Sequence, residues 1–168
     1  MDLSGKTYVV MGVANKRSIA WGAARALDKM GATLVFTILG ERFRKELDKL
    51  LVDLEGDHDI IVECDVTSDE DVAKAFKEIG EKTNCIDGVL HAIAFADKNE
   101  LTGGFSETSR DGFKMALDIS AYSLTIVSKY AKEIMNENGS IVTMTYLGGE
   151  RAMPNYNVMG VAKAALDA

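Results

Sequence analysis

The sequence is poor in residues that mark several classes of protein. It has one proline, Pro154, and only two cysteines, Cys64 and Cys85, in 168 residues. The two cysteines lack both the spacing of a metal site and the density of a disulfide scaffold, so we expect small buried thiols in a reducing compartment. This expectation places the chain in the cytoplasm and predicts that it holds no metal.

Concentrated positive charge and long apolar runs are also missing. The net charge is -7, and the nearest approach to a basic cluster is Arg42, Arg44 and Lys45, which Phe43 interrupts. Because nucleic-acid phosphates are bound by concentrated basic surfaces, this composition argues against a nucleic-acid partner. The apolar run at residues 8–11 is too short for a signal segment, and no stretch approaches a membrane span, so no membrane partner is expected.

Short apolar strands alternate with amphipathic helices along the chain. Strands are expected at residues 7–12, 33–38, 60–64, 88–95 and 140–146, and helices at 18–30, 41–54, 67–82, 110–135 and from about 155 onward. Near-continuous apolar strands indicate burial on both faces. The pattern therefore predicts five parallel strands in a doubly wound α/β sheet, Rossmann-like, within a single domain of residues 1–168. Gly22 is expected to let the first helix pack closely on that sheet.

The segment after the first strand has the composition of a phosphate-binding turn. A dinucleotide fold needs small residues where the backbone approaches a pyrophosphate, and a helix N-terminus that offers it N–H groups. Gly12, Ala14 and Ser18 meet these needs, although the usual G-x-G-x-x-G spacing is absent. The alternative is an ordinary turn between a strand and a helix.

Asp65 and Val66 follow the third strand, at the edge of the sheet where such folds place ligands. The Asp65 carboxylate can accept a hydrogen bond from an adenine amine. It can equally cap the helix that follows, and the sequence leaves both interpretations open.

Tyr156 and Lys163 lie seven positions apart in small, uncharged surroundings. On an α-helix that spacing is nearly two turns, about 10 Å, so both side chains emerge from one face. A nearby ammonium favours the ionised form of a phenol, which normally titrates near 10. The spacing alone is also compatible with a chance pair in a sequence that has many lysines.

Tyr146 and His91 are two further candidate side chains in the predicted strands. Tyr146 ends the fifth predicted strand, before a Gly-Gly turn, so it is either a second active-site phenol or an aromatic that closes the strand. His91 lies inside an apolar strand, and we expect it to be a hydrogen-bonded core residue without a catalytic role.

Several segments together resemble the bacterial enoyl-acyl carrier protein reductases of the short-chain dehydrogenase/reductase superfamily. These segments are GVANKRSIAWG, CDVTSDE, HAIAFA, SRDGFKMALDISAYSL and TYLGGERAMPNYNVMGVAKAALDA. They span nearly the whole chain. Most short-chain reductases carry a serine before the Tyr-x6-Lys pair, whereas this chain has the enoyl reductase arrangement of Tyr146, Tyr156 and Lys163.

The resemblance implies an enzyme of type II fatty-acid synthesis that reduces the trans-2 double bond of enoyl thioesters with a nicotinamide cofactor. Tyr156 would donate a hydrogen bond to the thioester oxygen, Lys163 would hold the nicotinamide ribose, and Tyr146 would shape the pocket. The cofactor-binding residues implied by position are Gly12, Ala14, Ser18 and Ile19 for the pyrophosphate, Asp65 and Val66 for adenine, and Ile93 and Ala94 for the ribose.

The resemblance also implies an acyl carrier protein as substrate carrier and a homotetramer that uses the helix at 110–135. Uncharged Leu39 and Gly40 after the second strand favour NADH, and Arg42 keeps NADPH possible. Members of the family continue with a further strand, a mobile loop over the acyl chain and a last strand, so the chain looks truncated at its C-terminus. Alternatives are a reductase of 3-oxoacyl thioesters and an inactive nucleotide-binding fragment.

Overall fold

The structure is a computed structural model that describes residues 2–56, 58 and 60–168. Its strands are β1 (Thr7–Met11), β2 (Thr33–Ile38), β3 (Ile61–Glu63), β4 (Ile86–His91) and β5 (Met135–Thr143). Its α-helices are α1 (Ile19–Lys29), α2 (Gly40–Leu51), α3 (Asp69–Thr83), α4 (Arg110–Leu117), α5 (Ser123–Ala131) and α6 (Asn157–Asp167). Short 3-10 turns lie at Lys98–Leu101, Phe105–Glu107 and Leu147–Gly149, and a π-helical turn lies at Asp118–Tyr122.

The strands form one parallel sheet in the order β3-β2-β1-β4-β5, which confirms the predicted doubly wound fold. In the central strand β1, Val9 pairs with Val35 of β2 on one side and Val89 of β4 on the other. All three valines are buried, as expected for strands covered on both faces. The strand order reverses between β1 and β4, which is where sheets of this kind bind ligands.

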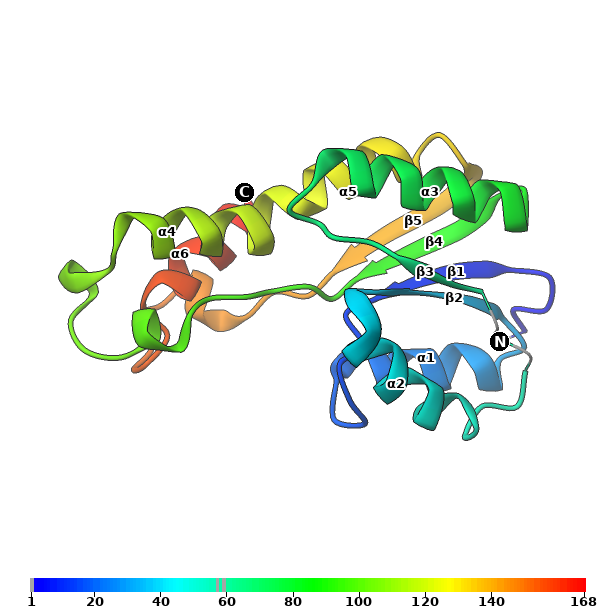
Figure 1. The fold of residues 1–168 in the computed structure, drawn as a ribbon, viewed down its shortest axis with the longest axis horizontal. Coiled ribbons are helices and arrows are strands. Elements are labelled where there is room, and N and C mark those ends of the chain that lie inside the picture. The colour runs from blue at the N-terminus through cyan, green and yellow to red at the C-terminus, as the bar shows by residue number, and fades with distance from the viewer. Residues whose placement is uncertain (1, 57, 59) are drawn as a thin grey trace. The chain divides into compact units, whose positions relative to one another are not determined.

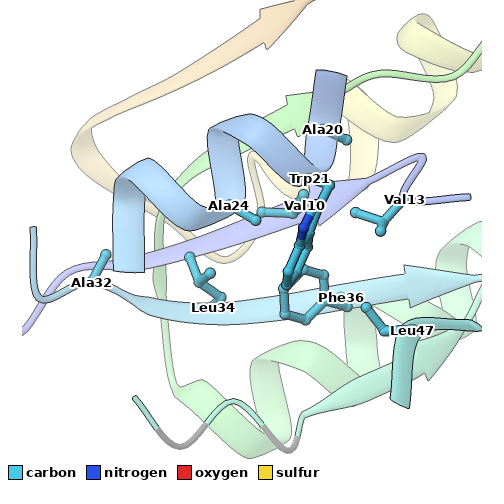
Figure 2. Close-up of a cluster of buried hydrophobic side chains, with 9 residues drawn as sticks. All are labelled: Val10, Val13, Ala20, Trp21, Ala24, Ala32, Leu34, Phe36 and Leu47. Atoms are coloured by element: carbon cyan, nitrogen blue, oxygen red, sulfur yellow. The ribbon is translucent and has the colours of Figure 1, made fainter. Parts of the chain in front are cut away.

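Helices cover both faces of this sheet, with α1 and α2 on one face and α3 on the other (Figure 1). Trp21 of α1 packs in a buried cluster with Val10 of β1 and Phe36 of β2 (Figure 2). Burying a side chain such as Phe36 contributes roughly 1.5–3 kcal/mol. The apolar spacing of α1 therefore fixes this helix, and the turn before it, against the sheet.

The chain folds as two compact units. One comprises Met1–Ala92 with Ser128–Thr143, and contains the sheet; the other comprises Ile93–Val127 with Met144–Ala168. In the second unit, α4 packs against α6. No helix among the described residues has the length and apolar character needed to cross a membrane.

Two predicted strands have different bounds in the structure. β4 ends at His91 rather than Phe95, because its pairing with β1 stops at His91 and the backbone of Phe95 is bonded to a helix instead. β5 begins at Met135 rather than residue 140, because Met135 pairs with Ile86 before a register shift. β5 forms one edge of the sheet, and its Val142 is 53% exposed.

The predicted role of Gly22 is wrong. A methyl group added there would meet no atom within 4 Å, and the residue is exposed on α1. Gly22→Ala is therefore expected to raise the free energy of unfolding by about 0.5–1 kcal/mol, because alanine loses less backbone entropy in a helix. Urea denaturation would measure the change.

Gly31→Ala is the matched control for Gly22→Ala. Gly31 has a φ of +84°, and its added methyl would lie 2.8 Å from the Ser4 hydroxyl oxygen, so this variant should lose stability. A Gly22→Ala chain that is less stable than the parent would contradict the expectation.

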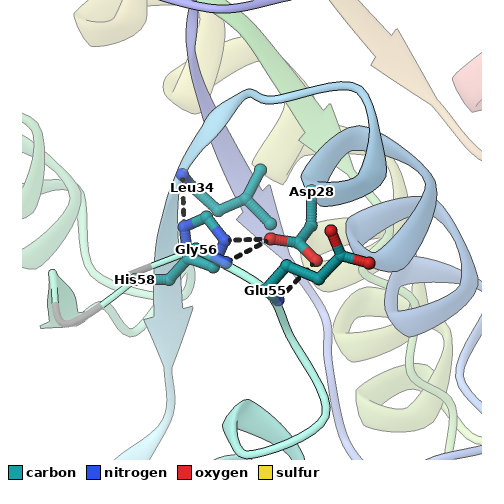
Figure 3. Close-up of polar contacts among 5 residues, drawn as sticks. All are labelled: Asp28, Leu34, Glu55, Gly56 and His58. Atoms are coloured by element: carbon teal, nitrogen blue, oxygen red, sulfur yellow. Dashed lines mark hydrogen bonds and ion pairs between the residues drawn. The ribbon is translucent and has the colours of Figure 1, made fainter.

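A buried Asp28–His58 pair fastens the segment after α2 to α1 and β2 (Figure 3). His58 Nδ1 accepts a hydrogen bond from the Leu34 N–H at 3.1 Å, so its proton lies on Nε2, which is 2.6 Å from Asp28 Oδ1. The same carboxylate accepts the N–H groups of Glu55 and Gly56 at 2.9 Å each. Burial alone would raise the pKa of Asp28, but these hydrogen bonds together lower it.

The stability of the fold is expected to depend on pH through Asp28. Its folded pKa lies below the ordinary 3.8, so the folded state binds this proton less tightly than the unfolded chain does. The contribution is fully present above pH 3.8 and is lost as the pH falls through the folded pKa. Asp28→Asn should therefore cost about 3 kcal/mol at neutral pH. In urea titrations that difference should shrink in acid, and a constant difference would refute the assignment.

Candidate active site

The two tyrosines predicted for the active site lie against each other. Tyr146 precedes the turn Leu147–Gly149, and Tyr156 is the N-cap residue of α6. Their ring centroids are 4.9 Å apart with an interplanar angle of 65°, an edge-to-face pair. The structure thus brings together two phenols that are ten positions apart in the sequence.

The helix that carries Lys163 begins two residues later than predicted. Asn155 and Asn157 have φ values of 57° and 32°, in the left-handed region that helix interiors avoid. Tyr156 therefore lies at the cap of α6, not inside it. Asparagine is among the few residues that tolerate this conformation, so the NYN sequence carried a signal that periodicity alone missed.

Glycines allow the turn at Leu147–Gly149 to lie directly on α6. A methyl group at Gly148 would lie 2.4 Å from Tyr156 Cδ1 and 3.0 Å from Tyr146 Cδ1. One at Gly160 would lie 2.8 Å from the Gly148 carbonyl oxygen. Absence of side chains at these positions is thus what makes room for the tyrosine pair.

Lys163 is buried, with 5% of its surface exposed. Its Nζ donates a hydrogen bond of 2.5 Å to the Met144 carbonyl oxygen, which lies just beyond the end of β5. Burial lowers the pKa of Lys163, and Asp167 partly opposes that shift. An ammonium has three donors, so the bond to Met144 leaves two for a ligand.

The pKa of Tyr156 is raised, whereas the sequence led us to expect that a nearby ammonium would lower it. Burial and the neighbouring Tyr146 raise it above the ordinary 10.0. The Lys163 ammonium is directed to Met144. A phenol with a raised pKa keeps its proton at neutral pH, so Tyr156 is suited to donate a hydrogen bond to a developing negative charge.

Gly12 allows β1 to end tightly against the residue after β4. Its φ is +93°, and a methyl group there would lie 2.1 Å from the Ala92 carbonyl oxygen. Any other residue would be both strained and obstructed. The packing of β1 against Ala92 therefore requires glycine at position 12, a requirement that the phosphate-binding interpretation did not include.

Ser18 organises the turn between β1 and α1. Its hydroxyl oxygen accepts the N–H groups of Ala14 and Asn15 at 3.0 Å each. As the N-cap residue of α1, Ser18 makes no side-chain hydrogen bond to the helix, and Ile19 at its first position is 66% exposed. The helix N-terminus thus lacks a side-chain cap, and phosphate groups bind such N-termini.

Asp65 is bonded within the turn before α3. Its Oδ1 accepts the Thr67 N–H at 2.9 Å and the Thr67 hydroxyl at 2.7 Å. The helix is capped instead by Ser68, whose hydroxyl accepts the Asp71 N–H at 3.2 Å. The helix-capping alternative for Asp65 is therefore wrong. Val66 beside it is buried.

Ile93 and Ala94 lie just after β4, whereas the predicted strand at 88–95 included them. Ile93 is half-buried and Ala94 is exposed. The backbone of the next residue, Phe95, bonds to Ser120 in the π-helical turn. Sequence reasoning gave no role to Ser120.

His91 and Cys64 are core residues, whereas Cys85 is only half-buried. His91 is fully buried, and its Nδ1 lies 3.0 Å from the Thr143 hydroxyl, which donates in turn to the His91 carbonyl oxygen at 3.1 Å. Burial, with nearby Asp65 and Asp71, raises the pKa of Cys64 to about 12, so this thiol is unreactive. No cluster of His, Cys, Asp and Glu within the described part of the chain could hold a metal.

The chain matches known proteins over almost its whole length. Residues 12–168 match a family described as enoyl-(acyl carrier protein) reductase. The NADPH enoyl-acyl-carrier-protein reductase FabI of Staphylococcus aureus is 59% identical over 100% of this chain, and the NADH enzyme FabI of Bacillus subtilis is 57% identical over 99%. The chain spans 66% and 65% of the lengths of these two relatives.

A solved structure agrees with the fold. The crystal structure of the Bacillus cereus enoyl-acyl carrier protein reductase with NADP+ and indole naphthyridinone has a TM-score of 0.96 and 54% identity. The match covers 99% of this chain and 65% of that one. With its parallel sheet, its paired tyrosines and its buried lysine, the chain belongs to the enoyl-(acyl carrier protein) reductase family.

Proposed function

We propose that this protein is an NADH-dependent enoyl-acyl carrier protein reductase that reduces the trans-2 double bond of enoyl thioesters in type II fatty-acid synthesis. The observation that carries the proposal is the edge-to-face pair of Tyr146 and Tyr156 at the N-terminus of α6, the helix that carries the buried amine of Lys163. Tyr156, Lys163 and Tyr146 are the proposed catalytic residues.

Tyr156 stabilises the charge that forms on the substrate. Reduced nicotinamide, when bound, supplies a hydride to the β-carbon of the enoyl thioester. Negative charge moves to the thioester oxygen, where the Tyr156 hydroxyl donates a hydrogen bond. Its raised pKa keeps the proton on the phenol while the enolate exists. A proton from solvent water then adds to the α-carbon and completes the saturated thioester.

Lys163 and Tyr146 support this step. Lys163 uses the N–H groups not bonded to Met144 to hold the nicotinamide ribose hydroxyls, and its positive charge favours the enolate. Tyr146 holds the Tyr156 ring by the edge-to-face contact and shapes the pocket beside it.

The proposed cofactor-binding residues follow the ends of the strands. They are Gly12, Ala14, Ser18 and Ile19 for the pyrophosphate, Asp65 and Val66 for adenine, and Ile93, Ala94 and Lys163 for the ribose. The fit is supported by the N-terminus of α1, which has no side-chain cap and so leaves its N–H groups for a ligand.

NADH is the proposed cofactor, with NADPH as a possible substitute. Leu39 and Gly40, after β2, are uncharged. Arg44 pairs with Asp48 at 2.9 Å, and Lys45 lies 3.6 Å from Glu41. Both basic side chains thus have carboxylate partners on their own helix, and neither is held in place for a 2′-phosphate. Comparing the KM values of the two cofactors tests the preference.

The proposed partners are an enoyl-loaded acyl carrier protein and further copies of the chain in a homotetramer. Met115 and Tyr122, on the helical segment at 110–131, are 44% and 45% exposed, which suits a contact between subunits. The proposed compartment is the cytoplasm, where the free thiols of Cys64 and Cys85 remain reduced. Light scattering of the purified protein would measure its molar mass and hence the number of subunits in the assembly.

The experiment that tests the function uses the protein as its gene encodes it. Oxidation of NADH, followed by its absorbance, is measured with crotonyl thioester and with acetoacetyl thioester. An enoyl reductase consumes NADH only with the crotonyl substrate. Turnover of the acetoacetyl thioester alone would establish the 3-oxoacyl reductase instead.

A nucleotide-binding chain without activity is the remaining alternative. Titration with NADH, followed by nicotinamide fluorescence, separates it from an enzyme. Binding with no turnover of either thioester would favour this alternative.

A further inference from the structure

The helical segment at 110–131 is interrupted by the π-helical turn Asp118–Tyr122. A π turn inserts one residue and breaks the regular hydrogen-bond ladder, and such turns are frequent at functional sites. Two fully buried serines lie at this turn, Ser120 within it and Ser123 directly after it. Their hydroxyls have different partners.

The Ser123 hydroxyl donates a hydrogen bond within its own helical segment. Its hydroxyl donates to the Ile119 carbonyl oxygen, four residues earlier, at 2.6 Å. This bond supplies a partner for a carbonyl at the irregular turn.

Ser120 bonds outside the helix. Its hydroxyl oxygen accepts the Phe95 N–H at 2.9 Å and donates to the Phe95 carbonyl oxygen at 3.1 Å. One hydroxyl thus satisfies both backbone groups of a single residue 25 positions earlier. Phe95 lies in no helix or strand, so this clamp replaces the ladder that ends with β4 at His91.

The clamp holds a segment whose side chains face outward. Phe95 is 49% exposed although its backbone is anchored, and Ala94 is also exposed. These residues follow the carboxyl end of a parallel strand, where ligands of such sheets bind. An aromatic ring on a fixed backbone suits contact with a substrate better than a role in the core.

We propose that Ser120 is a positioning residue for enoyl reduction, which acts by clamping the Phe95 backbone so that the Phe95 ring presents a fixed wall to the enoyl thioester. The inference rests on the proposed function. Ser120 acts only through Phe95 and contacts no reacting atom.

The test compares Ser120→Ala with Ser123→Ala in the protein as its gene encodes it. Both variants lose a buried hydroxyl at the same turn, so both should lower the melting temperature to a similar extent. Only Ser120→Ala should raise the KM for crotonyl thioester, by about tenfold or more, because it releases the substrate-facing segment. A purely structural role would lower the active fraction and leave KM unchanged.

Hydrogen exchange gives a second readout that does not depend on turnover. The Phe95 amide should exchange faster in Ser120→Ala than in Ser123→Ala, because only the first variant loses its acceptor. If Ser120→Ala does not fold, Ser120→Cys replaces it, since a thiol fills the site but bonds weakly. That variant should still raise KM, and a KM equal to the parent's would overturn the proposal.

The outcomes separate the two claims. An active parent whose KM is unchanged by the loss of the Ser120 hydroxyl, or raised equally in Ser123→Ala, refutes the positioning role alone. A parent that does not reduce crotonyl thioester refutes the proposed function and the positioning role with it.

Discussion

Replacing Lys163 with methionine is expected to abolish most enoyl reductase activity while the protein stays folded. Methionine keeps the length of the stem and removes the charge and its donors. The loss of a group that favours the enolate should lower kcat/KM by about 10²–10³-fold. The affinity for NADH should fall as well, because a charged hydrogen-bond donor to the ribose is lost.

The stability of Lys163→Met is set by two opposing effects. Burial lowers the pKa of Lys163, so an uncharged side chain at this position escapes the cost of a desolvated ammonium. In exchange, the Met144 carbonyl oxygen loses its donor, which costs about 1–3 kcal/mol. The melting temperature should therefore change little.

Steady-state kinetics and thermal melts of Lys163→Met and of Lys74→Met provide the measurement. Lys74 is exposed on α3, so its replacement should leave both kinetics and stability unchanged. If Lys163→Met retains the parent's kcat/KM, Lys163 has no part in the reaction.

Adding a single methyl group at Gly148 is expected to disable the tyrosine pair. The methyl would lie 2.4 Å from Tyr156 Cδ1 and 3.0 Å from Tyr146 Cδ1, so at least one ring must move. A displacement of about 1 Å at a catalytic group can cost about 10²-fold in rate. Overpacking of this kind also lowers the free energy of unfolding by about 1–3 kcal/mol.

Gly104→Ala is the matched control for Gly148→Ala. Gly104 has a φ of -78°, and its nearest contact to an added methyl is an ordinary 3.5 Å, so this variant should match the parent in kcat/KM and stability. A Gly148→Ala enzyme with the parent's kcat would show that the alignment of the two rings is unimportant.

The layered fold could be predicted from the sequence because its signals are local. Apolar runs such as the one from Thr33 to Ile38 are strands buried on both faces, and the helix that follows Ser68 has a visible capping pattern. Element type follows from this periodicity, and parallel order follows from the alternation of strand and helix.

The bounds of several elements could not be predicted because distant groups set them. β4 ends where its pairing with β1 stops at His91, and β5 starts where Met135 pairs with Ile86. Periodicity predicted one regular helix at 110–135, whereas the structure has a π turn at Asp118–Tyr122 and ends the last helical stretch at Ala131.

The candidate site was predictable in its residue types and not in its electrostatics. Spacing and resemblance indicated Tyr146, Tyr156 and Lys163, and the structure places the two rings in contact. The direction of the Tyr156 pKa shift depends on burial and on the neighbouring Tyr146, and no sequence pattern specifies either. The need for glycine at position 148 was likewise hidden in the sequence, because only the fold brings the rings of Tyr146 and Tyr156 next to it.

The most direct test of the central claim is the rate of hydride transfer by Tyr156→Phe. Phenylalanine keeps the ring that packs against Tyr146, so NADH affinity and melting temperature should equal the parent's. Because the hydrogen bond to the enolate oxygen is lost, kcat/KM with crotonyl thioester should fall by about 10²–10³-fold. A variant that reduces crotonyl thioester as fast as the parent would contradict the account.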